Sequence, residues 1–483
     1  MIYKNINYTQ MKNKQAIMLL AGIAIFNSHT ITAESPTNFV IIFMDDMGYG
    51  DLVNNGGIGY EMPNLEKMQH EGMSFTHFYA AQAVSGASRA GLMTGCYPNR
   101  IGMSGAGDHM TKTGIHEDEW TIAEVLKQKG YKTAAFGKWH LGHHKQFLPT
   151  HNGFDEYCGL PYSNDMWPNH PTGYNYYPDL PLIEGDQTIE LNPDQSQFTT
   201  RFTERAVGFI DKNKDNPFFL YLAHPMPHVP LFVSDKFKGK SKQGLYGDVM
   251  MELDWSVGQI LDKLKQEGLE ENTLVVVTSD NGPWINYGNH AGSTGGLREG
   301  KGASFEGGQR VPCLMQWKGK IPEGTICNKL SSTIDLLPTF ASLAEAPLPP
   351  HTIDGVNILP LIIGDKDANP RTDFYYYYRK NSLEAVQNGS FKLVLPHSYR
   401  TYEGFVPGND GQPGEVNEHK KLEEFLLFDL RRDPGERYNV YNQYPEVVAQ
   451  LMLLVEKARE DLGDDITNRI GSNTRPVGLY NQQ

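Results

Sequence analysis

Apolar residues follow two patterns along the chain: short unbroken runs, and longer stretches in which they recur every three or four positions. The unbroken runs at 38–44, 217–223 and 273–278 predict strands that are buried on both faces. The helical spacing predicts amphipathic helices, for example at 198–212 and 253–264. Strands that alternate with helices in this way are typical of an α/β fold.

A different pattern begins beyond residue 365. Short strands are predicted at 374–378, 383–387, 391–395 and 425–430, and a final helix at 445–462. The pair Asn388-Gly389 favours a tight hairpin turn between two of these strands. We therefore expect a large catalytic domain at 34–365 and a smaller C-terminal subdomain at 366–483, made of an antiparallel sheet and one helix.

The segment 149–193 shows neither pattern. It is rich in Pro, Tyr, Asn and Gly, and we expect a long loop, which in a compact enzyme is often a binding loop. Its polar and aromatic side chains, Asp165, Trp167, Asn169 and His170 among them, suit contacts with sugars, although ordinary loop packing accounts for any single one.

The first 33 residues are interpreted as a targeting segment rather than as part of the fold. Lysines precede the apolar run 16–26, and small residues follow up to Ala33, which is the order of a secretory signal peptide cleaved near Ala33. The run is too short to span a membrane as a helix, and no cysteine follows it to accept a lipid. We expect a secreted or periplasmic protein without a membrane anchor.

The net charge and the cysteines argue against two kinds of function, nucleic-acid binding and zinc binding by cysteines. The formal net charge is −14, so nonspecific binding to nucleic acid is not expected. The four cysteines lack the spacing of a zinc site, and we interpret them as small buried residues whose pairing the spacing leaves open. They are Cys96, Cys158, Cys313 and Cys327.

Two of the predicted strands end in oxygen-bearing side chains. Asp45-Asp46 follows the run 38–44, and Asp280-Asn281 follows the run 273–278. An α/β sheet places its ligands at the carboxyl ends of its strands, so these side chains are candidates for one shared site. Hard oxygen ligands of this kind suit Ca²⁺, or less well Mg²⁺, and disfavour zinc.

Cationic and proton-transferring side chains occur at three further places. Lys138 and His140 lie two residues apart on a segment predicted to be extended, so both would face the same side. His228 and its neighbour His224 lie among prolines, which stiffen the backbone. Lys301 lies in a glycine-rich stretch, where little side-chain bulk separates a cation from a ligand.

The stretch Ser85-Gly86-Ala87-Ser88-Arg89 is predicted to be a turn that enters a short helix closed by Gly95. The entrance of a helix offers unpaired N–H groups and a partial positive charge, which attract an anion. Taken alone, the stretch is better interpreted as a serine-rich surface turn, because short motifs often match by chance.

The residues singled out above, taken in their order along the chain, resemble the type I sulfatases, an arylsulfatase A-like group of the alkaline phosphatase-like superfamily. The signature of that family is Cys or Ser, any residue, Pro or Ala, Ser, Arg, and its first residue is oxidised to formylglycine (3-oxoalanine). The resemblance runs from about residue 39 to residue 439. It implies a large mixed, mostly parallel sheet sandwiched by helices, with a smaller C-terminal antiparallel sheet plus helix.

The resemblance also implies an activity and a role for each residue. The hydrated aldehyde at Ser85 would attack the sulfur of a sulfated carbohydrate while His228, with Lys301, protonates the departing oxygen, and His140 would then take a proton to expel sulfate. One Ca²⁺ would be held by Asp45, Asp46, Ser85, Asp280 and Asn281. The sulfate oxygens would be held by Arg89, Lys138 and Lys301. Candidate substrate contacts are Asp165, His170, His290 and Arg298.

The blocks at 147–165 and 288–301 look closest to arylsulfatase A-like and galactosamine-6-sulfatase-like enzymes, which favours galactose or N-acetylgalactosamine sulfate at a chain end as the substrate. The expected partners are such a glycan and a sulfatase-maturing enzyme that oxidises Ser85. Serine at 85, with Ala87 in place of the commoner proline, fits a natural serine-type enzyme or a replaced cysteine. A phosphatase or phosphodiesterase of the same superfamily would need a second metal set, which is missing. If Ser85 stays unmodified, a silent sulfated-glycan binding protein is the remaining alternative.

Overall fold

A computed structural model of the chain describes residues 36–480, which belong to one compact unit. The expected signal peptide at 1–33 lies outside the described residues. Among residues 36–480, no helix combines the length and the apolar character that crossing a membrane requires.

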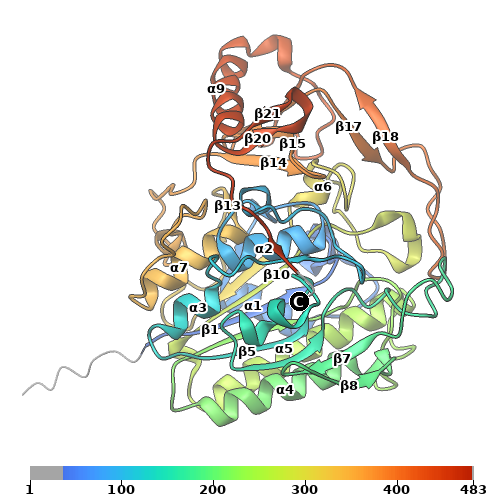
Figure 1. Cartoon of the computed structure of the whole chain (residues 1–483), viewed down its shortest axis with the longest axis vertical. Coiled ribbons are helices and arrows are strands. Elements are labelled where there is room, and N and C mark those ends of the chain that lie inside the picture. The colour runs from blue at the N-terminus through green and yellow to red at the C-terminus, as the bar shows by residue number, and fades with distance from the viewer. Residues whose placement is uncertain (1–35, 481–483) are drawn as a thin grey trace, which may run out of the picture. The chain divides into compact units, whose positions relative to one another are not determined.

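A ten-stranded mixed sheet forms the centre of the structure (Figure 1), in the order β12-β2-β11-β10-β1-β9-β5-β6-β7-β8. The central strands β10, β1, β9, β5 and β6 are parallel to one another, and β2, β11, β7 and β8 add antiparallel pairs toward the two edges. The bounds, in sheet order, are Thr325–Cys327, Met73–Phe75, Cys313–Gln316, Thr273–Ser279, Asn38–Met44, Phe218–Ala223, Lys132–Lys138, Glu156–Leu160, Pro181–Glu184 and Gln187–Leu191.

Alternate residues of β1 enter two different cores, one on each face of the sheet. Phe39, Ile41 and Phe43 pack on the face covered by α2 (Ser85–Thr94), α3 (Ile122–Lys127) and α7 (Leu336–Leu343). The residues between them pack on the face covered by α1 (Pro63–Glu71), α4 (Phe198–Asn213) and α5 (Leu245–Gln266), as Figure 1 shows. Burying one such Phe or Ile side chain stabilises the fold by roughly 1.5–3 kcal/mol, so the unbroken apolar run is what fixes this strand at the centre.

A second, antiparallel sheet lies near the C-terminus, in the order β14-β15-β16-β19. Its strands are Phe374–Tyr378, Ser382–Gln387, Phe391–Val394 and Leu426–Asp429, and α9 (Pro445–Leu462) packs on it. A separate ribbon is formed by β17 (His397–Thr401) and β18 (Asn417–Leu422). The remaining short strands and α-helices of the described residues are β3 (Phe78–Tyr79), β4 (Thr113–Gly114), α6 (Glu306–Gln309), β13 (Ser331–Ser332), α8 (Leu359–Ile362), β20 (Gly463–Asp464), β21 (Arg469–Ile470) and β22 (Gly478–Leu479).

The fold class expected from the sequence is confirmed, and the four cysteines are buried, as interpreted. Their pairing, which the spacing left open, is resolved in the structure, where all four are free. The expected loop at 149–193 is wrong in part, because it contains β6 of the main sheet and the hairpin of β7 and β8. These strands are short and are stabilised by pairing with distant segments, so they leave little local periodicity. The ribbon of β17 and β18, which the apolar pattern did not predict, consists mostly of polar residues.

Candidate active site

Ser85 is the first residue of α2, not part of a turn before it, and extended Val84 precedes it as the N-cap. Its Oγ donates a hydrogen bond to Asp280 Oδ2 at 2.5 Å and accepts one from Arg89 Nε at 3.0 Å. Ser85 and Arg89 are four residues apart, so they lie on one face of the helix. The neighbouring Gly86 is required by close packing, because a Cβ there would lie 2.7 Å from the carbonyl oxygen of Ala106. The helix therefore presents a buried hydroxyl beside a fixed guanidinium.

The carboxylates of the site stand at the ends of two neighbouring parallel strands. Met44 of β1 is paired with Ser279 of β10, so Asp45 and Asp280 leave the sheet side by side. The backbone N–H of Asp280 donates to the carbonyl of Met44 at 3.1 Å, which extends the pairing past the strands. Asp46 has a φ of 64°, and this turn directs its N–H to Asp280 Oδ1 at 3.1 Å. The strand-end acids predicted from the sequence thus meet in one place.

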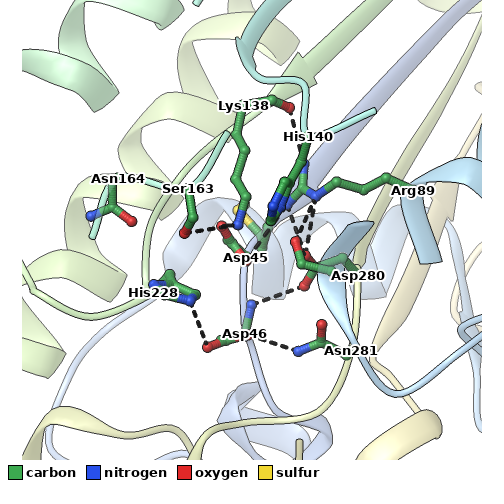
Figure 2. A network of polar contacts seen from close by, with 12 residues as sticks. Asp45, Asp46, Arg89, Lys138, His140, Ser163, Asn164, His228, Asp280 and Asn281 are labelled. Atoms are coloured by element: carbon green, nitrogen blue, oxygen red, sulfur yellow. Dashed lines mark hydrogen bonds and ion pairs between the residues drawn. The ribbon is translucent and has the colours of Figure 1, made fainter. Parts of the chain in front are cut away.

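Three cations pair with these three carboxylates, and Figure 2 shows two of them, Arg89 and Lys138, in the cluster. Arg89 Nη2 lies 2.9 Å from Asp280 Oδ2, Lys138 Nζ lies 2.5 Å from Asp45 Oδ2, and Lys301 Nζ lies 2.8 Å from Asp46 Oδ1. Burial alone would raise the pKa of Asp45, but Lys138, His228 and Arg89 outweigh it and lower that pKa. Burial alone would lower the pKa of Lys301, but the three carboxylates, Asp46 above all, raise it. Paired in this way, the three cations and three carboxylates carry formal charges that balance. Burial nevertheless lowers the pKa of Lys138, against the attraction of Asp45.

The two histidines expected in the site have different surroundings. His140 follows β5 with a φ of 62°, so the expectation of an extended segment through it was wrong, although it still lies beside Lys138 and Arg89 (Figure 2). Burial, with help from these two cations, holds the pKa of His140 well below its usual range. Its Nε2 lies 3.2 Å from the carbonyl oxygen of Gly107, and its Nδ1 has no hydrogen-bond partner among the described residues. A neutral imidazole with a free nitrogen can accept a proton.

The ring of His228 is oriented by the backbone of the next residue, Val229. Its Nδ1 lies 2.5 Å from the carbonyl oxygen of Val229, which makes Nδ1 the protonated donor and directs Nε2 toward Asp46 Oδ2 at 3.7 Å. The ring of Trp284 lies 5.7 Å away, between centroids. His224 differs: it is bonded to Ser256 Oγ at 2.9 Å, and burial lowers its pKa to about 3.

Two buried oxygens in this cluster lack a donor. Asp45 Oδ1 and Asn281 Oδ1 have no hydrogen-bond partner among the described residues, and a buried acceptor without a donor is costly. The ligand atoms of Asp45, Asp46 and His228 lie within 4.8 Å of one another. Free oxygen acceptors between carboxylates are what a hard divalent cation requires, so the residues present fit such an ion.

Of the candidate substrate residues, Asp165 lies close to the catalytic groups. Burial would raise the pKa of Asp165, but the nearby His170, His228, Ser163 and Lys138 lower it. The His170 Nε2 lies 3.8 Å from Asp165 Oδ2, while Asp165 Oδ1 has no hydrogen-bond partner among residues 36–480. Asp165 is therefore an ionised acceptor with one free oxygen.

The other two substrate candidates contact the C-terminal region instead. The Arg298 guanidinium lies 4.0 Å from the centre of the Phe305 ring and donates from Nη2 to the Tyr399 hydroxyl at 3.2 Å. His290 lies against Gly411, and Asp410 is close enough to affect its pKa, which burial lowers. The structure does not bring either side chain into the cluster around Ser85.

Several residues around the site escaped the sequence reasoning. Ser163 accepts a hydrogen bond from Lys138 Nζ at 3.2 Å, and the hydroxyl of Tyr221 accepts one from Arg89 Nη1 at 3.4 Å. Tyr221 lies within an apolar run and Ser163 within a loop, so no local sequence signal distinguishes them. Trp284 could have been found, because it lies only three residues after the predicted ligand Asn281. A cavity of about 190 Å³ opens beside the start of α2, and Gly86, Ala87 and His140 are among the residues that line it.

Comparisons with known proteins agree with this geometry. The family described as Sulfatase matches residues 37–346, and the C-terminal region of aryl-sulfatase matches residues 370–479. A third match, described as N-sulphoglucosamine sulphohydrolase, C-terminal, covers residues 300–400.

Individual relatives cover nearly the whole chain. N-acetylgalactosamine-6-sulfatase of Mus musculus is 36% identical and spans 93% of this chain and 90% of its own. Arylsulfatase A of Bos taurus is 37% identical, with 91% and 89% covered. Among solved structures, the PsFucS1 sulfatase from Pseudoalteromonas sp. aligns with a TM-score of 0.76 at 26% identity, over 87% of this chain and 89% of that one. Membership of this family implies a metal ion and a formylglycine, and the chain belongs to the sulfatase family as a sulfuric ester hydrolase.

Proposed function

We propose that this sulfatase hydrolyses sulfate esters of carbohydrates with one Ca²⁺ and a formylglycine made from Ser85. The observation that carries the proposal is the position of Ser85 Oγ, which is hydrogen-bonded to both Arg89 and Asp280 at the start of a buried helix. A small hydroxyl at a helix entrance, between a guanidinium and strand-end carboxylates, is suited to a reaction on an anionic ester.

The metal ligands in this proposal are oxygen atoms. Ca²⁺ would supply positive charge that neutralises a sulfate oxygen as the S–O bond breaks. Formylglycine would supply, after hydration, two hydroxyls on one carbon, where serine has a single one. The proposed ligands are Asp45, Asp46, Ser85, Asp280 and Asn281.

The protein's own residues divide the remaining work. The cations Arg89, Lys138 and Lys301 hold the negative sulfate oxygens, because each is buried and fixed by a carboxylate rather than free in solvent. His228 donates a proton to the departing sugar oxygen with help from Lys301, and Asp280 assists deprotonation at position 85. His140 accepts a proton at its free Nδ1.

The proposed substrate is a galactose or N-acetylgalactosamine sulfate at a chain end. The names of the relatives support it, since one acts on N-acetylgalactosamine sulfate. Asp165, with His170 behind it, offers a free oxygen to a sugar hydroxyl close to His228. His290 and Arg298 remain proposed contacts only for parts of a glycan that extend toward the C-terminal region.

The proposal includes the route by which the enzyme matures. Residues 1–33 would direct export to the periplasm or outside the cell, and a sulfatase-maturing enzyme would oxidise Ser85. Residues 34–365 would form the catalytic domain and residues 366–483 the C-terminal subdomain.

The test is a mass measurement together with an assay. In protein purified from its native organism, the peptide containing Ser85 is expected to be about two mass units lighter than its sequence predicts, and the protein to release sulfate from a sulfated monosaccharide. Unmodified Ser85 without sulfate release would favour a silent glycan-binding protein. Faster release of phosphate from the matched phosphate ester would favour a phosphatase.

A variant of His228 tests the proton donor. A sugar alkoxide needs a proton to leave, whereas an activated nitrophenolate leaves almost unaided. His228→Ala should therefore lower kcat/KM for a sulfated sugar by roughly a hundredfold, and for an aryl sulfate considerably less. His224→Ala is the matched control, since that buried histidine binds Ser256 instead, and it should affect both substrates equally. Equal losses for His228→Ala on both substrates would move the acid role to another residue, Lys301 first.

A further inference from the structure

Residues at the end of β17 and directly after it reach the glycine-rich segment that carries Lys301. The hydroxyl of Tyr402 donates a hydrogen bond to the backbone carbonyl oxygen of Lys301 at 2.5 Å. Arg400 Nη1 donates to the same oxygen at 3.4 Å. One backbone atom of a cationic residue in the catalytic cluster is thus held by two donors from a part of the chain about 100 positions away in the sequence.

A second pair of hydrogen bonds holds Glu299, two residues before Lys301. Its Oε1 accepts from Thr401 Oγ1 at 2.7 Å, and its Oε2 accepts from the backbone N–H of Tyr402 at 2.9 Å. Glu299 has a φ of 59°, a left-handed conformation that a non-glycine residue keeps only where its surroundings hold it. Residues 400–402 therefore fix the backbone on both sides of Gly300.

The side chain of Lys301 depends on this anchoring. Its Nζ lies 2.8 and 2.9 Å from the two oxygens of Asp46 and 4.5 Å from the centre of the Trp284 ring. Its backbone N–H donates to the carbonyl oxygen of Pro283 at 2.9 Å. The ammonium group and the backbone N–H of Lys301 are thus held by the large domain, whereas its carbonyl oxygen is held by Tyr402 and Arg400. A long flexible stem places its ammonium group accurately only if the backbone beneath it is fixed.

We propose that Tyr402 is a positioning residue for Lys301, and that the C-terminal ribbon in this way controls how the ammonium group meets the sulfate ester. The inference rests on the role proposed above for Lys301. Tyr402 itself contacts neither the carboxylates nor Ser85 among the hydrogen bonds of residues 36–480. Its effect passes through the carbonyl of Lys301, whose position shifts when the hydroxyl is lost.

The experiment is a double-mutant cycle on protein in which conversion of Ser85 has been measured. Tyr402→Phe removes one oxygen, and kcat for a sulfated sugar should fall by about tenfold with KM changed much less, the scale of a small misplacement. In the Lys301→Ala background the same substitution should change kcat less than about twofold, because the group it positions is gone. All four proteins are assayed on the same sulfated sugar, because a cycle compares like with like.

Tyr377→Phe is the matched control. That tyrosine is also buried, but its hydroxyl donates to the carbonyls of Ala458 and Gly463 in the C-terminal subdomain and not to Lys301. It should lower stability without lowering kcat per folded molecule. If Tyr402→Phe folds poorly, Thr401→Val, which removes a bond to Glu299, should show the same dependence on Lys301.

Two results would overturn the inference and can be told apart. Equal losses from Tyr402→Phe with and without Lys301, in an active enzyme, would show a general structural role and leave the proposed function standing. Absence of turnover by modified wild-type protein would overturn the proposed function and the inference with it.

Discussion

Replacement of Ser85 by alanine is expected to reduce sulfate release to the uncatalysed background while the protein still unfolds cooperatively. The substitution removes one oxygen from a small buried residue, and the ion pair between Arg89 and Asp280 at 2.9 Å remains to hold the start of α2. The lost hydrogen bonds should cost stability on the order of 1 kcal/mol each, too little to unfold a domain of this size. The chemistry, by contrast, loses its nucleophile entirely.

The measurement is sulfate release by purified Ser85→Ala protein, with a thermal unfolding curve on the same sample. Thr94→Ala is the control, because Thr94 is also buried in α2 but donates its hydroxyl only to the carbonyl of Ala90 within the helix. Wild-type turnover by Ser85→Ala would exclude Ser85 as the nucleophile and would overturn the proposed mechanism.

Removal of the metal is expected to have an effect of similar size. Chelation should abolish turnover, and Ca²⁺ should restore it better than Zn²⁺, because the free acceptors Asp45 Oδ1 and Asn281 Oδ1 are hard oxygens. Without the ion, the formal charges of the three carboxylates and the three cations of the site cancel. A divalent ion would make the site positive and allow it to draw in an anionic ester despite a chain charge of −14.

Calcium binding can be measured independently of turnover. Asp45→Asn should weaken Ca²⁺ affinity by at least an order of magnitude, since it removes one of few charged ligands. Asp51→Asn is the matched control: burial raises the pKa of Asp51 to about 6, and its carboxylate accepts from Tyr246 and the backbone of Gly48 and Ser293. Full activity in protein verified to be free of metal would contradict the assignment.

The sequence predicts best those features in which a local pattern and the fold act together. The run 38–44 is apolar on both faces, so it had to be a central strand, and the acids at its end had to lie where parallel strands end. Asp45 and Asp280 lie side by side because β1 and β10 pair in register. The two apolar runs 38–44 and 273–278, each followed by an acid, already suggest this pairing.

Other features depend on pairing between distant segments. The prediction that His140 faces the same side as Lys138 rested on the alternation of side chains along a strand. The strand ends at Lys138, however, and His140 itself has a left-handed backbone conformation. Ser163 and Tyr402 carry no local mark, because their roles come from partners at Lys138 and Lys301. Arg298 was expected to contact the substrate. In the structure its guanidinium packs on the Phe305 ring and donates a hydrogen bond to the Tyr399 hydroxyl. Its assignment as a substrate contact remains a prediction.

The burial of α2 has a consequence for the order of events in the cell. All ten residues of this helix are buried, and Ser85 itself is 2% exposed. A separate enzyme that oxidises Ser85 needs the peptide in its own cleft, and a fully packed helix cannot be extended into one without unfolding much of the domain. In the maturation proposed above, oxidation of Ser85 would therefore have to be complete before the chain folds. Chains that close too early would form a stable but permanently inactive population, so the specific activity of a preparation would report how slowly the chain folded during its synthesis.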